Sequence, residues 1–291
     1  MKRLKVFFIT CAAVALVGLV MLVAGASTGG VEGFDAVAAD HDWISGSPGA
    51  RASVEQNDLE FENIEAIGYM DVVIVGERYY NDMADEYELG TITEPNAGTV
   101  IALFGSNLEE PDFKVEGKTL KINAPEIEQD KITLNFSSED VYPTVIVFCP
   151  DKELKSIKLN SSISDVEMKG ISFKYADIAN NTGDVDAENI TSQGIKIISD
   201  TGDVELSGDL RGTTDVSIET GDVEIDTALP LDKYTMNLKT DTGEIGIGEG
   251  EIEDDDFEGY EYTQDGGEDE LIIRTNTGDI EIEQMAGGVS L

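Results

Sequence analysis

Short runs of alternating apolar and polar residues recur through the second half of the chain at a nearly constant interval. Each run follows the tetrapeptide Thr-Gly-Asp-Val or a close variant, which begins at Thr182, Thr201, Thr220, Thr242 and Thr277. The steps between these copies are 19, 19, 22 and 35 residues, and a degenerate copy lies at Asp165-Val166-Glu167-Met168. Self-similarity with a period near 20 residues is typical of solenoid proteins.

Aligning the repeats on their acidic residue brings apolar residues into columns. One column follows the acid directly and contains Val166, Val185, Val204, Val223, Ile245 and Ile280. A second lies two residues further on, at Met168, Ala187, Leu206, Ile225, Ile247 and Ile282, and a third six residues before the next acid, at Ile178, Ile197, Val216, Leu238 and Ile273. Alternation with a period of two predicts strands with one buried face. Such strands bury their apolar sides if successive repeats stack as coils, about 4.8 Å apart. The pattern predicts an all-β fold, a right-handed parallel β-helix or solenoid whose coils follow the order of the chain.

The N-terminal region has a different pattern. Three cations among the first five residues precede an uncharged run from Val6 to Ala26, which is typical of an export signal. The small residues Val23-Ala24-Gly25-Ala26 favour cleavage, whereas a run of about 20 residues favours a retained transmembrane helix. We expect residues 1–26 to form a signal anchor, 27–52 a linker, and 53–291 the β-helical domain. Within that domain, residues 53–150 are expected to form irregular coils, and 151–291 the Thr-Gly-Asp repeats.

The charge of the chain restricts its partners. Its 291 residues include 60 acidic and 19 basic side chains, which give a net charge of −41, and 41% of them are hydrophobic. This apolar content is sufficient for a core, whereas the acidic surface would repel nucleic-acid phosphates and anionic lipid head groups. We therefore expect no nucleic-acid partner, and membrane contact through the N-terminal helix. The predicted location is the cell membrane, with the C-terminal domain outside the cytoplasm.

The acidic residues of the repeats form a column of their own, at Asp184, Asp203, Asp222, Glu244 and Asp279. Carboxylates about 5 Å apart repel each other by roughly 3 kcal/mol at an effective dielectric constant of about 20. Two arrangements would offset this repulsion. Each carboxylate could accept a backbone N–H of the turn, as Asp commonly does after Gly, or Ca²⁺ ions could lie between the coils. The calcium-binding nonapeptide motif Gly-Gly-x-Gly-x-Asp does not occur in the sequence, which favours the hydrogen-bonding arrangement.

An acid-rich insertion separates the last two repeats, between Gly248 and Leu271. Such a segment is by default a solvated loop. Asp254, Asp256, Glu258 and Asp265 within it reproduce part of the EF-hand spacing, although Glu261 replaces the usual apolar residue and the flanking segments look like strands. These four residues are weak candidate metal ligands, compatible with weak Ca²⁺ binding. The sequence indicates no other cofactor and no catalytic residues.

Two further features concern aromatic residues and cysteine. The tyrosines at 79, 80, 87, 260 and 262 lie in acidic, loop-like contexts and are expected to be exposed. Exposed tyrosines suit sugar or protein binding, although tyrosines at strand ends are also common. Cys149 follows the apolar run Thr144–Phe148 and is expected to be a small buried residue.

The Thr-Gly-Asp-Val and Thr-Gly-Asp-Ile repeats, preceded by Phe61-x-x-Ile64 and Asp71-Val72-Val73-Ile74, resemble the bacterial putative-adhesin family over roughly residues 53–291. The resemblance implies a β-helical domain of unknown function and supplies no catalytic residues. The order of span, linker and domain is similar to that of anchored members from Gram-positive bacteria. Some relatives are similar to accessory proteins of Lia-type envelope stress systems.

These features predict a non-enzymatic cell-surface protein, an adhesin-like module that binds an extracellular surface ligand or an envelope protein. An alternative is an accessory regulator or sensor of a cell-envelope stress response, since an acidic surface attracts cationic antimicrobial peptides. A third is a polysaccharide-active enzyme, because paired carboxylates on a β-helix can serve as acid and base. The scarcity of cations among the repeats, where Arg211 and Arg274 are the only arginines, disfavours this third function.

Overall fold

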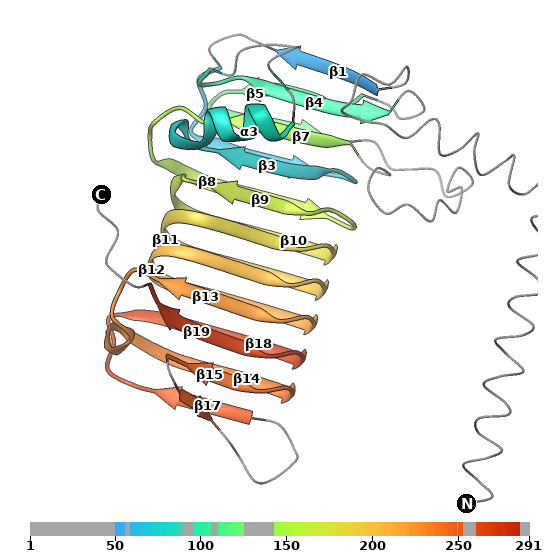
Figure 1. The fold of residues 1–291 in the computed structure, drawn as a ribbon. Helices are drawn as coiled ribbons and strands as arrows, with labels where there is room; N and C mark the ends of the chain where they lie inside the picture. Colours follow the sequence, from blue (N-terminus) through green and yellow to red (C-terminus); the bar gives the residue numbers. More distant parts are fainter. Residues whose placement is uncertain are drawn as a thin grey trace, which may run out of the picture. The chain divides into compact units, whose positions relative to one another are not determined.

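The fold is a stack of β-coils, seen in a computed structural model of the chain (Figure 1). The structure describes residues 50–55, 59–87, 89, 96–105, 110–124, 143–248, 250–252 and 260–285. The strands among these residues belong to one continuous hydrogen-bonded sheet. The predicted N-terminal helix at residues 1–26 and nearly all of the linker lie outside the described residues. Within the described part of the chain, no helix is long and apolar enough to cross a membrane.

Each coil contributes one strand to each of two faces, which we call face A and face B. Face A contains, in spatial order, β4 (Val100–Gly105), β7 (Thr144–Phe148), β3 (Asp71–Val75), β9 (Val166–Lys169), the first parts of β11 (Val185–Thr201) and β12 (Val204–Thr220), β13 (Val223–Thr227), β19 (Ile280–Gln284), β15 (Ile245–Ile247) and β16 (Gly250–Ile252). Face B contains β5 (Asp112–Glu116), β6 (Thr119–Asn123), β2 (Asn63–Ile67), β8 (Leu154–Ser161), β10 (Ser172–Thr182), the second parts of β11 and β12, β18 (Asp269–Thr277), β14 (Tyr234–Thr242) and β17 (Tyr260–Gln264). Strand β1 (Ala50–Glu55) pairs with β4.

The predicted apolar columns form the core between the two faces. The first column is Val145, Val72, Val166, Val185, Val204, Val223, Ile280 and Ile245, with each residue in register with the next and at most 2% exposed. Val72 and Val145 belong to residues 53–150, so the regular stacking extends into the part of the chain for which irregular coils were predicted. Parallel stacking is confirmed, and the right-handed sense of the winding stays a prediction.

The order of the coils differs from the predicted order at the C-terminal end. Strand β12 pairs with β18, and β18 in turn pairs with β14. On face A, β13 likewise pairs with β19, which pairs with β15. The last repeat, 269–284, therefore lies between coils that precede it in the sequence. The prediction of a chain-ordered stack was wrong here, because the two competing repeats carry the same inward-facing pattern.

The N-terminal end has the same arrangement. Strands β2 and β3 come first in the chain among these coils, yet they lie between the coil of β6 and β7 and the coil of β8 and β9. In both cases the coil nearest its end of the sequence occupies the second place in the stack.

Antiparallel strands cover the two ends of the stack. Strands β4 and β5 pair with the outermost coil at one end, and β16 and β17 pair with the outermost coil at the other. Strands β16 and β17 belong to the acid-rich insertion, so the expectation of a solvated loop is wrong for residues 250–252 and 260–264. Tyr260 and Tyr262 are in register with the inward-facing Thr240 and Leu238, which places them over the end of the core.

A second apolar cluster covers part of the outer surface of face A. Helix α3 (Tyr80–Glu86) follows the 3-10 turn η2 (Glu77–Tyr79), and its Tyr80 and Met83 pack against Val73, Ile146 and Phe148. The Tyr80 hydroxyl donates to the carbonyl of Cys149, and its ring meets Phe148 edge-on at 5.1 Å between centroids. Cys149 is buried as expected, and burial raises the pKa of its thiol to about 12.

Candidate functional site

The acidic residues of the turns form a hydrogen-bonded ladder along one corner of the stack. Each backbone N–H donates to the carboxylate of the preceding rung: Asp165 to Asp71 (3.0 Å), Asp184 to Asp165 (3.0 Å), Asp203 to Asp184 (2.8 Å), Asp222 to Asp203 (2.8 Å), Asp279 to Asp222 (2.7 Å) and Glu244 to Asp279 (2.8 Å). The hydrogen-bonding arrangement is therefore the one found, with the donor supplied by the neighbouring coil. Charge-assisted bonds of this kind offset the repulsion between stacked carboxylates.

The candidate calcium ligands are divided between described and undescribed residues. Asp254, Asp256 and Glu258 lie outside the described residues, and Asp265 is exposed in the connection between β17 and β18. Among the residues that the structure describes, no group of three or more acidic, histidine or cysteine side chains is placed to hold a metal ion. Weak Ca²⁺ binding by the insertion stays a prediction.

The tyrosines expected to be exposed are not. Tyr80 is 8% exposed and belongs to the core, and the other four are half-buried. Tyr79 lies over Gly170, where an added Cβ would come within 2.5 Å of its ring. Its hydroxyl accepts a hydrogen bond from Asn189 Nδ2 at 2.5 Å and donates to Glu188 Oε1 at 3.3 Å. Tyr79 is therefore packed against a corner of the stack, although its acidic neighbours in the sequence, Glu77 and Asp82, are exposed.

A groove runs along the corner opposite the Thr-Gly-Asp turns, where each coil passes from face A to face B. It has a volume of about 580 Å³ and crosses successive coils, from η2, which follows β3, to residues 228–229, which follow β13. Ile190, Ala228 and Leu229 give it an apolar part, and Glu77, Arg78, Asp151, Asp209 and Arg211 give it charged groups. Its size and its mixture of apolar and polar groups are those of ligand sites.

Irregular backbone at this corner shapes the groove. The pairing of β11 with β12 shifts register between Ala187 and Ile190 and again between Ser192 and Gly194. Asn189, between the two shifts, has a φ of 52°, and its N–H donates to Ser207 Oγ at 3.1 Å. Such bulges bend strands and redirect side chains beside functional sites.

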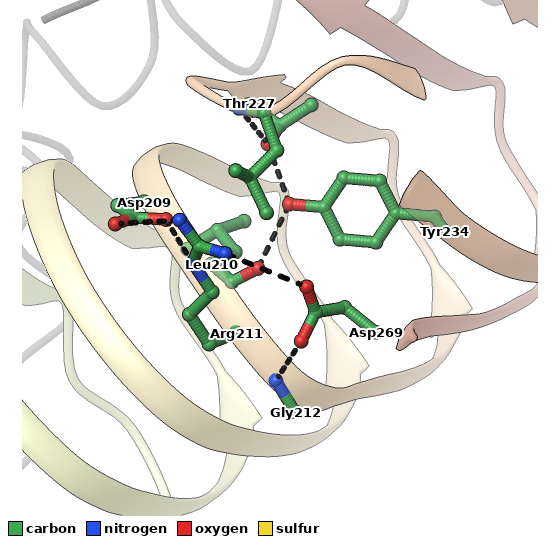
Figure 2. Close-up of polar contacts among 8 residues, drawn as sticks. Asp209, Leu210, Arg211, Gly212, Thr227, Tyr234 and Asp269 are labelled. Atoms are coloured by element: carbon green, nitrogen blue, oxygen red, sulfur yellow. Dashed lines mark hydrogen bonds and ion pairs between the residues drawn. The ribbon is translucent and has the colours of Figure 1, made fainter. Parts of the chain in front are cut away.

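Arg211 is held in place by carboxylates on two strands (Figure 2). Its Nε donates to Asp209 Oδ1 at 2.6 Å, and its Nη1 lies 4.0 Å from Asp269 Oδ2. Asp269 also accepts the backbone N–H of Gly212 at 2.8 Å. The hydrogen bond to Asp209 is the main cause of a raised pKa for Arg211. These contacts orient the guanidinium, while the side chain remains 49% exposed.

A buried hydroxyl network supports this part of the groove from behind. The Tyr234 hydroxyl donates to the carbonyl of Leu210 at 2.8 Å and lies 2.6 Å from Thr227 Oγ1, which accepts the N–H of Leu229 at 3.1 Å. Burial raises the pKa of Tyr234 to about 12, so the hydroxyl stays protonated at neutral pH. The network ties the backbone of Leu210, directly before Arg211, to one buried ring, while Asp269 holds the backbone of Gly212 directly after it (Figure 2).

Arg78 supplies the second cation of the groove. It lies on η2, is exposed, and takes part in none of the ion pairs between described residues. Sequence reasoning did not identify the groove, because Arg78 and Arg211 are far apart in the chain. The scarcity of arginine in so acidic a chain is the signal that could have drawn attention to them.

The outer surfaces of the two faces carry different charge patterns. On face A, Glu167, Asp186, Glu205, Glu224 and Glu281 lie in register on successive strands. Burial and the neighbouring carboxylates raise the pKa of Asp186 and of Glu224. On face B, the corresponding column is Lys121, Glu65, Lys158, Asp177, Lys196 and Asp215, in which the sign alternates from strand to strand.

Comparison with solved structures finds distant likenesses. A putative cell adhesion protein from Clostridium sporogenes matches with a TM-score of 0.46 and 13% identity, over 81% of this chain and 99% of that chain. A putative adhesin from Bacteroides fragilis matches with a TM-score of 0.33 and 11% identity, over 82% and 98%. A putative lipid binding protein from Parabacteroides distasonis matches with a TM-score of 0.32 and 13% identity, over 83% and 98%. No curated protein matches the sequence.

The family assignment comes from the sequence profile of Toastrack DUF4097, which matches residues 98–283. This range includes every Thr-Gly-Asp repeat and most of the strands of both faces. The chain therefore belongs to the Toastrack DUF4097 family.

Proposed function

We propose that this chain is a non-enzymatic surface-binding module of the adhesin type, which takes up a short stretch of neutral glycan in the groove. In this proposal, residues 1–26 anchor it in a bacterial cell membrane, and residues 27–52 link the anchor to the domain outside. The observation that carries the proposal is the groove itself, with Arg211 oriented at its edge by Asp209 and Asp269.

The charges around the groove favour a neutral ligand. Arg78 and Arg211 are outnumbered by Glu77, Asp151 and Asp209, so the groove offers no net attraction to an anion. It offers both donors and acceptors instead. A sugar hydroxyl can donate to a carboxylate and accept from a guanidinium at the same time, so a chain of hydroxyl groups suits such a lining.

The shape and the apolar part of the groove favour an extended chain. The groove crosses several coils, so a polymer could lie along the stack and contact residues of successive coils. Ala228 and Leu229, which are half-buried, present aliphatic carbon to it, against which the C–H faces of sugar rings can be buried. Because Arg211 is already oriented, binding loses little side-chain entropy there.

A glycan array probed with the full chain tests this function. We expect binding to neutral oligosaccharides, and a loss of at least about tenfold in affinity for Arg211→Ala and for Arg78→Ala. Arg274→Ala is the matched control, because Arg274 is also 49% exposed and also faces an aspartate, but lies on face B away from the groove. Binding to no glycan, or equal loss in all three variants, would contradict the proposal, and release of shortened sugars would point to an enzyme.

A second candidate function is favoured by the carboxylate column on face A. Outside the area that α3 covers, this surface attracts cationic molecules, which suits a sensor of cationic antimicrobial peptides in an envelope stress response. Deleting residues 53–291 should then change the output of the stress regulator. In that case, charge-neutralising variants at Glu205 and Glu224 should weaken the response, while Arg211→Ala should leave it unchanged.

A further inference from the structure

The outer surface of face B combines balanced charge with exposed apolar groups. Along its column of alternating sign, Glu65, Lys158, Asp177 and Lys196 take part in none of the ion pairs between described residues. Their charges are therefore free to meet a partner. In a chain with a net charge of −41, a surface whose charges cancel is a place where two like-charged molecules can approach.

Exposed apolar side chains gather on the same surface. The large hydrophobic side chains that are most exposed in the described part of the chain are Ile67 (46%), Ile198 (45%) and Tyr175 (43%). All three lie on strands of face B. Ile67 and Ile198 share one column, which runs through Ile67, Asn160, Ala179 and Ile198 beside the alternating charges.

We propose that face B binds a second copy of this chain about a two-fold axis parallel to the strands and located between β8 and β10. This axis reverses the order of the strands in the partner. Lys158 then faces Asp177 of the second copy, Glu65 faces Lys196, and Lys121 faces Asp215. An alternating column with an even number of charges is self-complementary under such a reversal.

The same axis matches the apolar groups. Ile67 faces Ile198 of the second copy, and Asn160 faces Ala179. Opposing pairs in both columns are therefore compatible at once, one set by charge and the other by burial of apolar surface. A two-fold axis along the stack would instead place Lys158 on Lys158 and Asp177 on Asp177, which repel each other.

Face A cannot serve as the self-association surface in this way. Its outward column is acidic on successive strands, so any two-fold pairing would bring carboxylates together, at a cost of several kcal/mol for desolvated like charges. The charge pattern therefore selects one face of the stack for a second copy.

The available area sets the strength of the contact. Six strands about 4.8 Å apart, overlapped over five to seven residues of about 3.3 Å each, give roughly 480–670 Å² per copy. This is below the roughly 800 Å² per partner of a standard interface. The dimer should therefore be weak and reversible, and should form at high local concentration on a surface.

Disulfide trapping in the full chain tests the geometry. Residues 67 and 198 lie three strands apart within one chain, about 14 Å, which is too far for an intrachain disulfide. In a Cys11→Ser background, Ile67→Cys/Ile198→Cys should form a disulfide-linked dimer under mild oxidation. The matched control is Ile67→Cys/Ser217→Cys. It should stay monomeric, because Ser217 on β12 would face β6 of the second copy, which is the strand next to the one that holds Ile67. No dimer, or equal dimer in both variants, would overturn the proposal.

Sedimentation velocity tests the charge pairing independently. Lys196→Glu, which sets two glutamates against each other, should raise the dimer dissociation constant by at least about tenfold. Lys239→Glu makes the same charge change on β14, outside the overlap, and should have less than about a twofold effect. Glu65→Lys/Lys196→Glu restores opposite charges and should restore the dimer. A chain that stays monomeric throughout, or a dimer that Lys196→Glu does not weaken, would overturn the proposal.

Discussion

The backbone N–H of Asp279 donates a hydrogen bond to the carboxylate of Asp222 over 2.7 Å, although 57 residues separate the two in the chain. The carboxylate of Asp279 in turn accepts the N–H of Glu244 at 2.8 Å. The last repeat is therefore part of the ladder and not its end. Glu244, the single glutamate of the ladder, occupies the final rung, where no further coil requires its carboxylate as an acceptor.

Paired cysteines would establish this order of coils in solution. Ser217 and Arg274 are in register on neighbouring strands of face B, whereas Lys239 lies one strand further away. Ser217→Cys/Arg274→Cys should therefore form an intrachain disulfide, and Ser217→Cys/Lys239→Cys should not, since two strand spacings exceed disulfide reach. The reverse result, read by mass spectrometry of the oxidised chains, would mean that the coils follow the chain order.

The glycine of the turn should be indispensable for stacking. Gly221 has a φ of +146°, and an added Cβ would lie 2.1 Å from the carbonyl oxygen of Gly202 on the next coil. Gly221→Ala should cost about 3 kcal/mol or more of unfolding free energy, from backbone strain and overpacking together. Gly117→Ala is the control, because its φ is also positive while nothing lies within 4 Å of the added Cβ. We expect about 1 kcal/mol for the control, measured by urea denaturation, and equal losses would refute the close approach.

A charge in the apolar column should prevent stable folding. Val204 is 1% exposed and lies between Val185 and Val223. Val204→Asp places an unpaired carboxylate in the core and should lower the unfolding free energy by at least about 3 kcal/mol. Glu205→Gln, one residue along on the outer surface, should melt at or above the wild-type temperature, because it removes a like-charge contact. A Val204→Asp variant that melts like the wild type would contradict the inward assignment.

Asp71 should make the stability of the fold depend on pH. Burial, and to a lesser extent the charge of Asp165, raises the pKa of Asp71 from 3.8 to about 6. The folded state then binds this proton more tightly than the unfolded state, so the stabilisation is complete below about pH 4 and is lost as pH rises through about 6.

Asp71→Asn keeps an acceptor oxygen and removes the titration. It should be more stable than wild type by about 3 kcal/mol at pH 7, and by roughly half of that at pH 5. Urea denaturation at the two pH values measures the difference. A constant difference between the two proteins would show that Asp71 titrates at an ordinary pKa.

Much of the fold could be predicted from the repeats, because the alternation around Val185, Val204 and Val223 directly reports which side chains face inward. The order of the last two coils could not. Leu238 and Ile273 fill equivalent core positions, so the apolar pattern is the same whichever coil lies next to β12. The one local sign of the order is that the last rung has Glu244 where the rung before it has Asp279. This sign can be interpreted only when the ladder of turn hydrogen bonds is known.

The candidate site was less accessible to sequence reasoning. The groove arises where bulges near Asn189 and the short turn at Arg78 come together, and neither follows the period of the repeats. The prediction that the tyrosines are exposed was wrong for a related reason. Acidic neighbours suggested solvent, but Tyr80 belongs to α3 and packs into the apolar cluster on face A, and Tyr260 and Tyr262 lie over the end of the core.

The groove at the corner opposite the Thr-Gly-Asp turns is the proposed ligand site. Hydrogen exchange of the full chain, with and without a neutral oligosaccharide selected from the array, tests it most directly. We expect slower exchange in the backbone at 189–191, 208–212 and 227–229, and unchanged exchange along the acidic column of face A. Protection confined to face A or to face B, with none in these three segments, would contradict it.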